Sequence, residues 1–149
     1  MPGYYDMSQH GTGRVFFVKI RDYSNPHEAI EEFLRDNGVG FASIQGIGGF
    51  EWVRIGVYSP EENKYYTEEV KALPGRVLEC VSLQGNSILG PDGSYYTHLH
   101  VAVARKPGEV YAGHLVDGRV DPFLELVIIE LPGSVEEARR LLSHRWSKA

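Results

Sequence analysis

The chain has 149 residues and a mass of 16.7 kDa, the size of one ordinary domain. Hydrophobic residues make up 42% of the sequence and charged residues 23%, which excludes disordered, collagen-like and coiled-coil proteins. The formal net charge of −5 disfavours non-specific binding to nucleic-acid phosphates, because the field of the whole protein repels them.

Cysteine content and the N-terminal sequence bear on the compartment. The single cysteine, Cys80, can form neither an internal disulfide nor a zinc site built from several thiolates, which favours a reducing compartment. The N-terminus has no basic start before an apolar stretch, and no run approaches the roughly 18 apolar residues of a membrane span. We predict a cytoplasmic protein with no membrane partner, in which a flexible leader of residues 1–12 precedes one domain of residues 13–149.

The first predicted elements are a strand and an amphipathic helix. Residues 14–20 are rich in β-branched and aromatic side chains, which is typical of a strand. Asn25 precedes a proline and lies three residues before Glu28, a pattern typical of a helix N-terminus. Gly38 supplies a stop, and the apolar residues in between recur at helical spacing. This predicts a helix that packs one apolar face on a sheet.

A glycine cluster follows at residues 46–49. Residues 41–45 and 51–58 predict two strands, with the glycines between them. A dinucleotide-binding loop would need a third glycine at position 51 and a helix directly after it. The sequence has Glu51 and a strand pattern there, so we exclude a nucleotide-binding loop.

The rest of the chain alternates strand patterns with turn residues. Further strands are predicted over residues 64–70, 78–83, 96–104, 110–116 and 123–131. Gly85 and Asn86 end the second of these as a turn. Ser134 and Glu137 form a capping-box pattern for a helix that runs to about Arg145. The order predicts an α/β chain of the α+β type, a single domain whose mostly antiparallel β-sheet is flanked by two helices.

Histidines are the most informative residues of the sequence. His98 and His100 lie two residues apart in one predicted strand, so their imidazoles project to the same face, with Cα atoms roughly 7 Å apart. If this strand and residues 110–116 form a hairpin centred near Lys106, paired residue numbers sum to about 212, which sets His114 opposite His98. This register predicts a cluster of three histidines on one face of the sheet.

Three neutral imidazoles on a rigid sheet, with one position left open, are a recurrent arrangement of catalytic zinc. Iron, nickel or copper can occupy the same arrangement, so the geometry predicts a divalent metal without identifying it. Zinc is the ion that we expect first. Such an ion activates water and polarises a carbonyl group, which suits hydrolysis, decarboxylation or enolisation. Glu125 and Glu130 lie in an otherwise apolar strand, on opposite faces. Glu125 is the candidate fourth ligand, partner of a ligand, or catalytic base.

Each of these residues also has a simpler structural interpretation. Histidines in strands are usually hydrogen-bonded core or surface residues, and an isolated His-x-His pair is only moderately specific for a metal. Cys80 is typical of a small buried hydrophobic residue. Four C-terminal cations either contact nucleic acid or, as we favour, complement the dipole of the last helix: Arg139, Arg140, Arg145 and Lys148. The aromatic residues fit a pocket, an interface or ordinary strand packing equally well, among them Trp52, Tyr58, Tyr65, Tyr66, Tyr95 and Tyr96.

Several segments together resemble the PPC domain, a family named for its conservation between plants and prokaryotes. The resemblance covers residues 13–131, and its motifs are fairly specific in this order and spacing. They are Gly46-Ile47-Gly48, Leu83-Gln84-Gly85-Asn86, His98-Leu99-His100, Gly113-His114-Leu115 and Phe123-x-Glu125. Four of these positions are expected in family-motif loops: Gly46, Gly48, Gly85 and Asn86.

The resemblance implies a compact α/β domain with a curved, largely antiparallel sheet that assembles as a homotrimer. It also implies, for prokaryotic members, a metal held by histidines that match His98, His100 and His114. The same fold group includes acetolactate decarboxylase, whose zinc is bound by a His-x-His pair and a later histidine. A shared fold does not transfer a substrate.

Plant members of the family are nuclear proteins in which a basic AT-hook, which enters the DNA minor groove, precedes this domain. This sequence contains no AT-hook, so it resembles a stand-alone prokaryotic member. A plant motif implicated in partner contacts, Gly-Arg-Phe-Glu-Ile-Leu, is echoed by residues 75–80 with one extra residue before the glutamate.

The sequence leaves three hypotheses open. The first is a homotrimer that binds a divalent metal through three histidines and acts on a small carbonyl or carboxylate compound. The second is a DNA-binding regulatory module, as in the plant proteins. The third is a metal-free structural or ligand-binding trimer in which the histidines only form hydrogen bonds.

Overall fold

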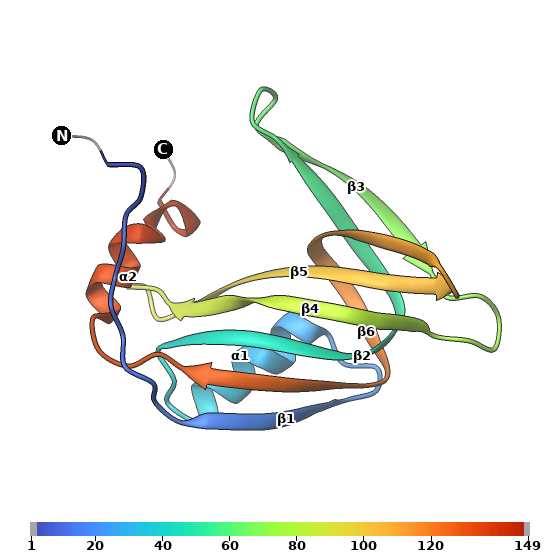
Figure 1. Ribbon diagram of the computed structural model, residues 1–149, viewed down its shortest axis with the longest axis horizontal. Coiled ribbons are helices and arrows are strands. Elements are labelled where there is room, and N and C mark those ends of the chain that lie inside the picture. Colours follow the sequence, from blue (N-terminus) through green and yellow to red (C-terminus); the bar gives the residue numbers. More distant parts are fainter. Residues whose placement is uncertain (1–2, 148–149) are drawn as a thin grey trace.

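The computed structural model describes residues 3–147. Its elements are β1 (Val15–Arg21), α1 (Pro26–Asp36), β2 (Phe41–Ser59), β3 (Lys64–Lys71), β4 (Leu78–Leu89), β5 (Tyr95–Lys106), β6 (Glu109–Glu130), α2 (Val135–Leu141) and the 3₁₀ helix η1 (Ser143–Arg145) (Figure 1). The strands form one sheet in the order β1-β6-β5-β4-β2-β3, and every pairing is antiparallel. This confirms the predicted α+β fold, with its antiparallel sheet and two helices.

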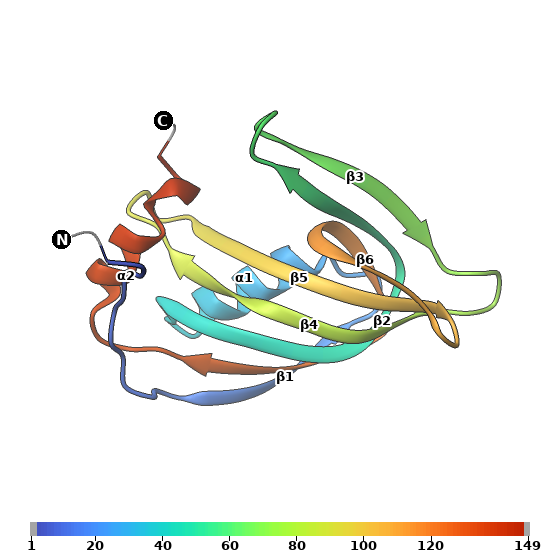
Figure 2. The ribbon, with the colours of Figure 1, turned by 45° about the horizontal axis from the view of Figure 1, so that its top comes forward.

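Two strands are longer than predicted, and both bend. β2 continues through the glycine cluster, where we expected a break between two strands. β6 likewise joins the predicted strands 110–116 and 123–131 into one. β2 and β6 pair with each other along most of their length, with several register shifts. Because each shift bends the strand locally, the sheet curves back on itself (Figure 2).

The four glycine and asparagine positions expected in loops lie inside strands instead, which corrects that prediction. Gly46 and Gly48 belong to β2, and Gly85 and Asn86 belong to β4. A Cβ on Gly46 or Gly48 would come closer than 3.0 Å to the backbone of β6. These positions therefore need glycine because strands approach each other closely there, and the chain does not turn.

Helix α1 forms as predicted and covers one face of the sheet (Figure 2). The side chain of Asn25 accepts a hydrogen bond from the backbone N–H of Glu28 at 3.1 Å, which caps the helix. Gly38, with φ of +65°, follows its C-terminal end. Ile30 and Leu34 are fully buried, so the helix closes the hydrophobic core on this side.

Helix α2 differs from its prediction. Ser134 has φ of +50° and forms no side-chain cap, so the expected capping box is absent from this described segment. An N-cap residue usually has extended backbone, whereas Ser134 has the left-handed conformation. The helix ends at Leu141, and Arg145 belongs to η1. Lys148 lies outside the described residues.

Of the predicted leader, residues 3–12 contain no helix or strand, and residues 1–2 lie outside the described part of the chain. The ring of His10 packs edge-on against Phe41, with centroids 5.2 Å apart. Within residues 3–147, no helix combines the length and the apolar character that crossing a membrane requires. Cys80 is 3% exposed in β4, and burial raises the pKa of its thiol to about 12, which confirms its structural role.

Arg14 and Glu130 tie the start of β1 to the end of β6. The guanidinium of Arg14 donates to both carboxylate oxygens of Glu130, at 3.0 and 2.9 Å, and to the carbonyl of Asn37 at 2.8 Å. These bonds lower the pKa of Glu130 to about 2. The pair therefore stabilises the fold fully only where Glu130 would also be ionised in the unfolded chain.

We expect Glu130→Gln to lower the melting temperature at pH 7, because it removes this ion pair. The folded-state pKa lies below the ordinary value of 4.5, so the stabilisation is present above pH 4.5 and fades as the pH falls toward 2. Thermal denaturation from pH 7 down to about pH 3 measures whether the melting temperatures of variant and wild type converge as the pH falls. Glu61→Gln, in the exposed β2–β3 turn, is the control. A difference that stays constant across this range would contradict the prediction.

Candidate metal centre

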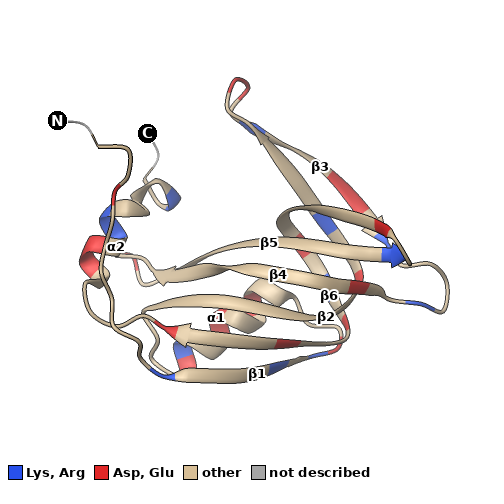
Figure 3. Cartoon of the chain, viewed as in Figure 1, with Lys and Arg blue, Asp and Glu red and all other residues tan. Residues whose placement is uncertain are grey.

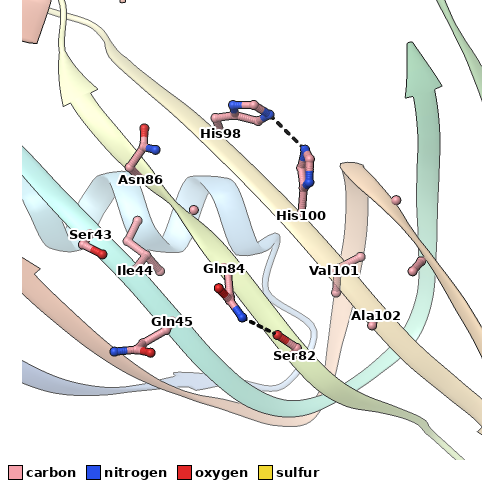
Figure 4. Close-up of a pocket in the computed structure, with 13 residues that line it drawn as sticks. Ser43, Ile44, Gln45, Ser82, Gln84, Asn86, His98, His100, Val101 and Ala102 are labelled. Atoms are coloured by element: carbon pink, nitrogen blue, oxygen red, sulfur yellow. Dashed lines mark hydrogen bonds between the residues drawn. The ribbon is translucent and has the colours of Figure 1, made fainter. Parts of the chain in front are cut away.

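Three histidines from neighbouring strands meet on one face of the sheet. His98 and His100 lie in β5, and His114 lies in β6. One ligand nitrogen from each residue lies within 4.8 Å of the other two. The Nε2 atoms of His98 and His100 are 3.2 Å apart (Figure 4). Three nitrogens at this spacing are close enough to converge on one ion.

The register of the hairpin differs from the predicted one. His114 pairs with His100, where we expected it opposite His98. The hairpin turns at Pro107 and Gly108, which has φ of +79°, so its centre lies beyond Lys106. The three rings still meet, because His98 and His100 share a face, and the ring centroid of His114 lies 5.1 and 5.8 Å from theirs.

Burial lowers the pKa of two of these imidazoles, those of His98 and His114. The pKa of His98 is lowered to about 4, chiefly by burial and then by the positive charge of Arg145 and of neighbouring imidazoles. Burial and His100 also lower the pKa of His114. His98 is therefore neutral at pH 7, which is the form of histidine that binds a metal ion.

The surroundings of His114 provide a test of whether the residues fit a metal. Its Nδ1 atom is buried and has no hydrogen-bond partner among the described residues. Tyr65 of β3 stacks on the ring, with centroids 4.6 Å apart and planes 26° from parallel. A buried polar atom without a partner costs free energy, so a cluster that binds nothing is left incomplete. Three convergent imidazoles fit a divalent ion.

A groove of about 780 Å³ opens beside the histidines. Its lining is polar where it approaches His98 and His100, since Gln84 and Asn86 of β4 project beside them (Figure 4). No carboxylate lines it among residues 3–147. His98 also lines a second recess, of about 270 Å³, together with Tyr65, Tyr96, Thr97, His114, His144 and Arg145.

The two candidate carboxylates lie elsewhere. Glu125 belongs to the half of β6 that pairs with β1 and with the start of β2, whereas His114 belongs to the half that pairs with β5. Glu125 lines a different recess with Phe17 and Gln45, and it is outside the ligand group that the described residues form. Glu130 is engaged by Arg14. The bend of β6 separates the carboxylates from the histidines within one chain.

Two of the four C-terminal cations, Arg139 and Arg145, form hydrogen bonds within the molecule. Arg139 donates to the carbonyl of Leu89 at 2.8 Å, and Arg145 donates to Oδ1 of Asn86 at 2.7 Å. In the view of Figure 3, basic and acidic residues are interspersed along the strands and on α2. This distribution favours the structural interpretation of these cations over a DNA-binding surface.

Two residues of the site were not assigned to it from the sequence. Tyr65 fitted a pocket or an interface equally well, and only the pairing of β2 with β3 brings it onto His114. Arg145 was expected on the solvated end of a helix. Its position depends on the packing of Trp146 against Tyr96, a long-range contact with no local signal.

Residues 7–132 match the Plants and Prokaryotes Conserved (PCC) domain, the family that the sequence resembles. A comparison with curated protein sequences finds no match. The chain is similar to solved structures of a metal-containing protein from Archaeoglobus fulgidus, at 31% identity, and of a PPC protein from Pyrococcus horikoshii, at 29% identity. Each has a TM-score of 0.78 over 87% of both chains.

More distant structures share the fold alone. A proposed DNA-binding protein from Bacteroides thetaiotaomicron is 22% identical, with a TM-score of 0.70, over 85% of this chain and 87% of its own. The α-acetolactate decarboxylase of Bacillus subtilis is 18% identical, with a TM-score of 0.54. That match covers 78% of this chain and 52% of the decarboxylase.

Proposed function

The chain belongs to the plants and prokaryotes conserved domain family, and we propose that it is a homotrimer that binds a divalent metal through His98, His100 and His114. The observation that carries the metal site is the convergence of the three ligand nitrogens within 4.8 Å. The unpartnered Nδ1 atom of His114 and the metal-containing relative from Archaeoglobus fulgidus support it.

Zinc is the ion proposed first, because three imidazoles with an open side suit it, and iron and nickel are the alternatives. A bound divalent ion would polarise a carbonyl or carboxylate oxygen of a small compound in the groove. The chain itself would hold the three imidazoles on the paired strands β5 and β6, which keeps their positions fixed. The amides of Gln84 and Asn86 line the groove and offer hydrogen bonds that would orient a polar compound.

The exposed face of the sheet supports self-association. Phe16 packs on Phe33 of α1, so Phe17, its neighbour in β1, points to the opposite face. On that face Phe17 is 70% exposed, and Ile47 and Val81 are each 57% exposed. They line one recess together. Adjacent exposed apolar side chains mark a protein interface, and a homotrimer would cover them.

Elemental analysis of untagged protein, purified and then reconstituted with zinc, iron or nickel, tests the metal proposal. About one ion per chain is expected, because the three histidines form one site. Binding should raise the free energy of unfolding by about 4 kcal/mol at a metal concentration 1,000 times Kd, and the melting temperature should rise with it. No retained ion, or a melting temperature that chelation leaves unchanged, would favour the metal-free hypothesis.

Light scattering tests the homotrimer. It should give three times the chain mass of 16.7 kDa, and a single-chain mass would overturn the trimer alone.

A further inference from the structure

Arg145 lies beside the three histidines, although it is distant from them in the sequence. With His98 and His114 it lines the recess of about 270 Å³. The ring of Trp146 packs against Tyr96 of β5, with centroids 5.3 Å apart, and this contact anchors the C-terminal segment. The recess is thus closed on one side by η1 and carries a guanidinium next to the proposed metal site.

Two neutral acceptors fix the orientation of this guanidinium. Arg145 donates to the carbonyl of Tyr96 at 3.2 Å and to Oδ1 of Asn86 at 2.7 Å. Asn86 is itself the register partner of His98 in the adjoining strand. A guanidinium has five N–H donors, so these two bonds leave further donors for a ligand in the recess.

The charge of Arg145 is unusual in having no counterion among residues 3–147. Three arginines of the described chain are partly buried: Arg105, Arg139 and Arg145. Arg105 pairs with Glu109, and Arg139 pairs with Glu136. Within residues 3–147, no carboxylate forms an ion pair with Arg145. A partly buried cation without a counterion is costly, and the free energy is recovered when an anion binds.

The charge of the recess favours an anionic ligand beside Arg145. Every residue that lines it is neutral or basic, and a divalent ion on the histidines would make the site more positive still. An anion with at least two oxygen atoms would match the planar fork of Arg145. A volume of about 270 Å³ limits this anion to a small molecule.

We propose that Arg145 binds the carboxylate of a small 2-oxo or 2-hydroxy acid, whose second oxygen lies toward the three histidines. The histidine part of this inference rests on the proposed function, but the carboxylate subsite is defined by Arg145 itself. Inorganic phosphate would offer the guanidinium the same oxyanion chemistry, so it enters the test as the competing ligand.

The test compares acids with their uncharged amides. Pyruvate and lactate are titrated against zinc-loaded and metal-free protein, beside pyruvamide, lactamide and inorganic phosphate, and the fluorescence of Trp146 and Trp52 reports binding. The acids are expected to bind about 10- to 100-fold more tightly than the amides, the usual range for hydrogen bonds to a charged group. Arg145→Gln should remove this preference and leave the zinc content unchanged. Arg145→Lys should keep part of it, and Arg140→Gln, exposed on α2, is the matched control.

Three results would overturn the inference. The wild type could bind acids and amides equally, or bind neither. An Arg145→Gln variant could fold and keep the preference for acids, or phosphate could bind more tightly than both acids. Because the metal-free titration is run in parallel, a failure to retain zinc would overturn the proposed function alone. The acid-to-amide ratio in the metal-free protein would still decide the carboxylate subsite.

Discussion

His100→Ala is expected to lose its metal during purification, and His98→Ala and His114→Ala are expected to do the same. Structural zinc sites with four protein ligands have binding free energies of about 10–16 kcal/mol, which is about 3 kcal/mol for each ligand. Removing one of three imidazoles should therefore weaken binding by roughly 10²- to 10³-fold. Plasma mass spectrometry of the purified variants, and competition with a chromophoric chelator, measure the loss.

His10→Ala is the matched control for these variants. Its imidazole packs on Phe41 and hydrogen-bonds to Ser8, away from the ligand group, so this variant should retain the metal of the wild type. His98 and His100 lie outside the buried core, so their loss should leave the fold intact, which circular dichroism checks. Metal content that stays unchanged in both the His98 and His100 variants would contradict the assignment of the site.

Local patterns were sufficient for the features that depend on one element. The cap at Asn25 and the apolar face of α1 are encoded within the helix itself, and both form as predicted. The histidine cluster was predicted on a wrong register and still forms. Alternation along β5 puts His98 and His100 on one face, and a shift of two residues in β6 returns His114 to that same face.

Features that depend on contacts between distant segments could not be predicted. The glycines of β2 suggested a break, yet the strand continues because β6 lies close enough to exclude a Cβ. Glu125 shares an apolar strand pattern with its neighbours, but the bend of β6 carries it away from His114. Arg145 joins the site only because the C-terminal segment folds back on Tyr96.

Gly85 occupies the tightest of these close approaches, directly beneath the site. It pairs with Leu99 in the register of β4 and β5, between the pairs formed by His98 and His100. A Cβ on Gly85 would come closer than 3.0 Å to the carbonyl group of His98. Because the obstructing atoms are backbone, no rotation of a side chain relieves the clash, and one of the two strands must move.

Gly85→Ala is therefore expected to destabilise the fold and to displace His98. Overpacking of this kind costs about 1–3 kcal/mol or more, which corresponds to a fall in the melting temperature of roughly 2–12 °C for a chain of this size. Metal affinity should fall as well, because the shifted strand carries two of the three ligands. Gly40→Ala is the matched control, since a Cβ there meets no atom within 4 Å, and its melting temperature should match or slightly exceed that of the wild type. If Gly85→Ala melts and binds metal like Gly40→Ala, the close approach of β4 and β5 does not hold His98 in place.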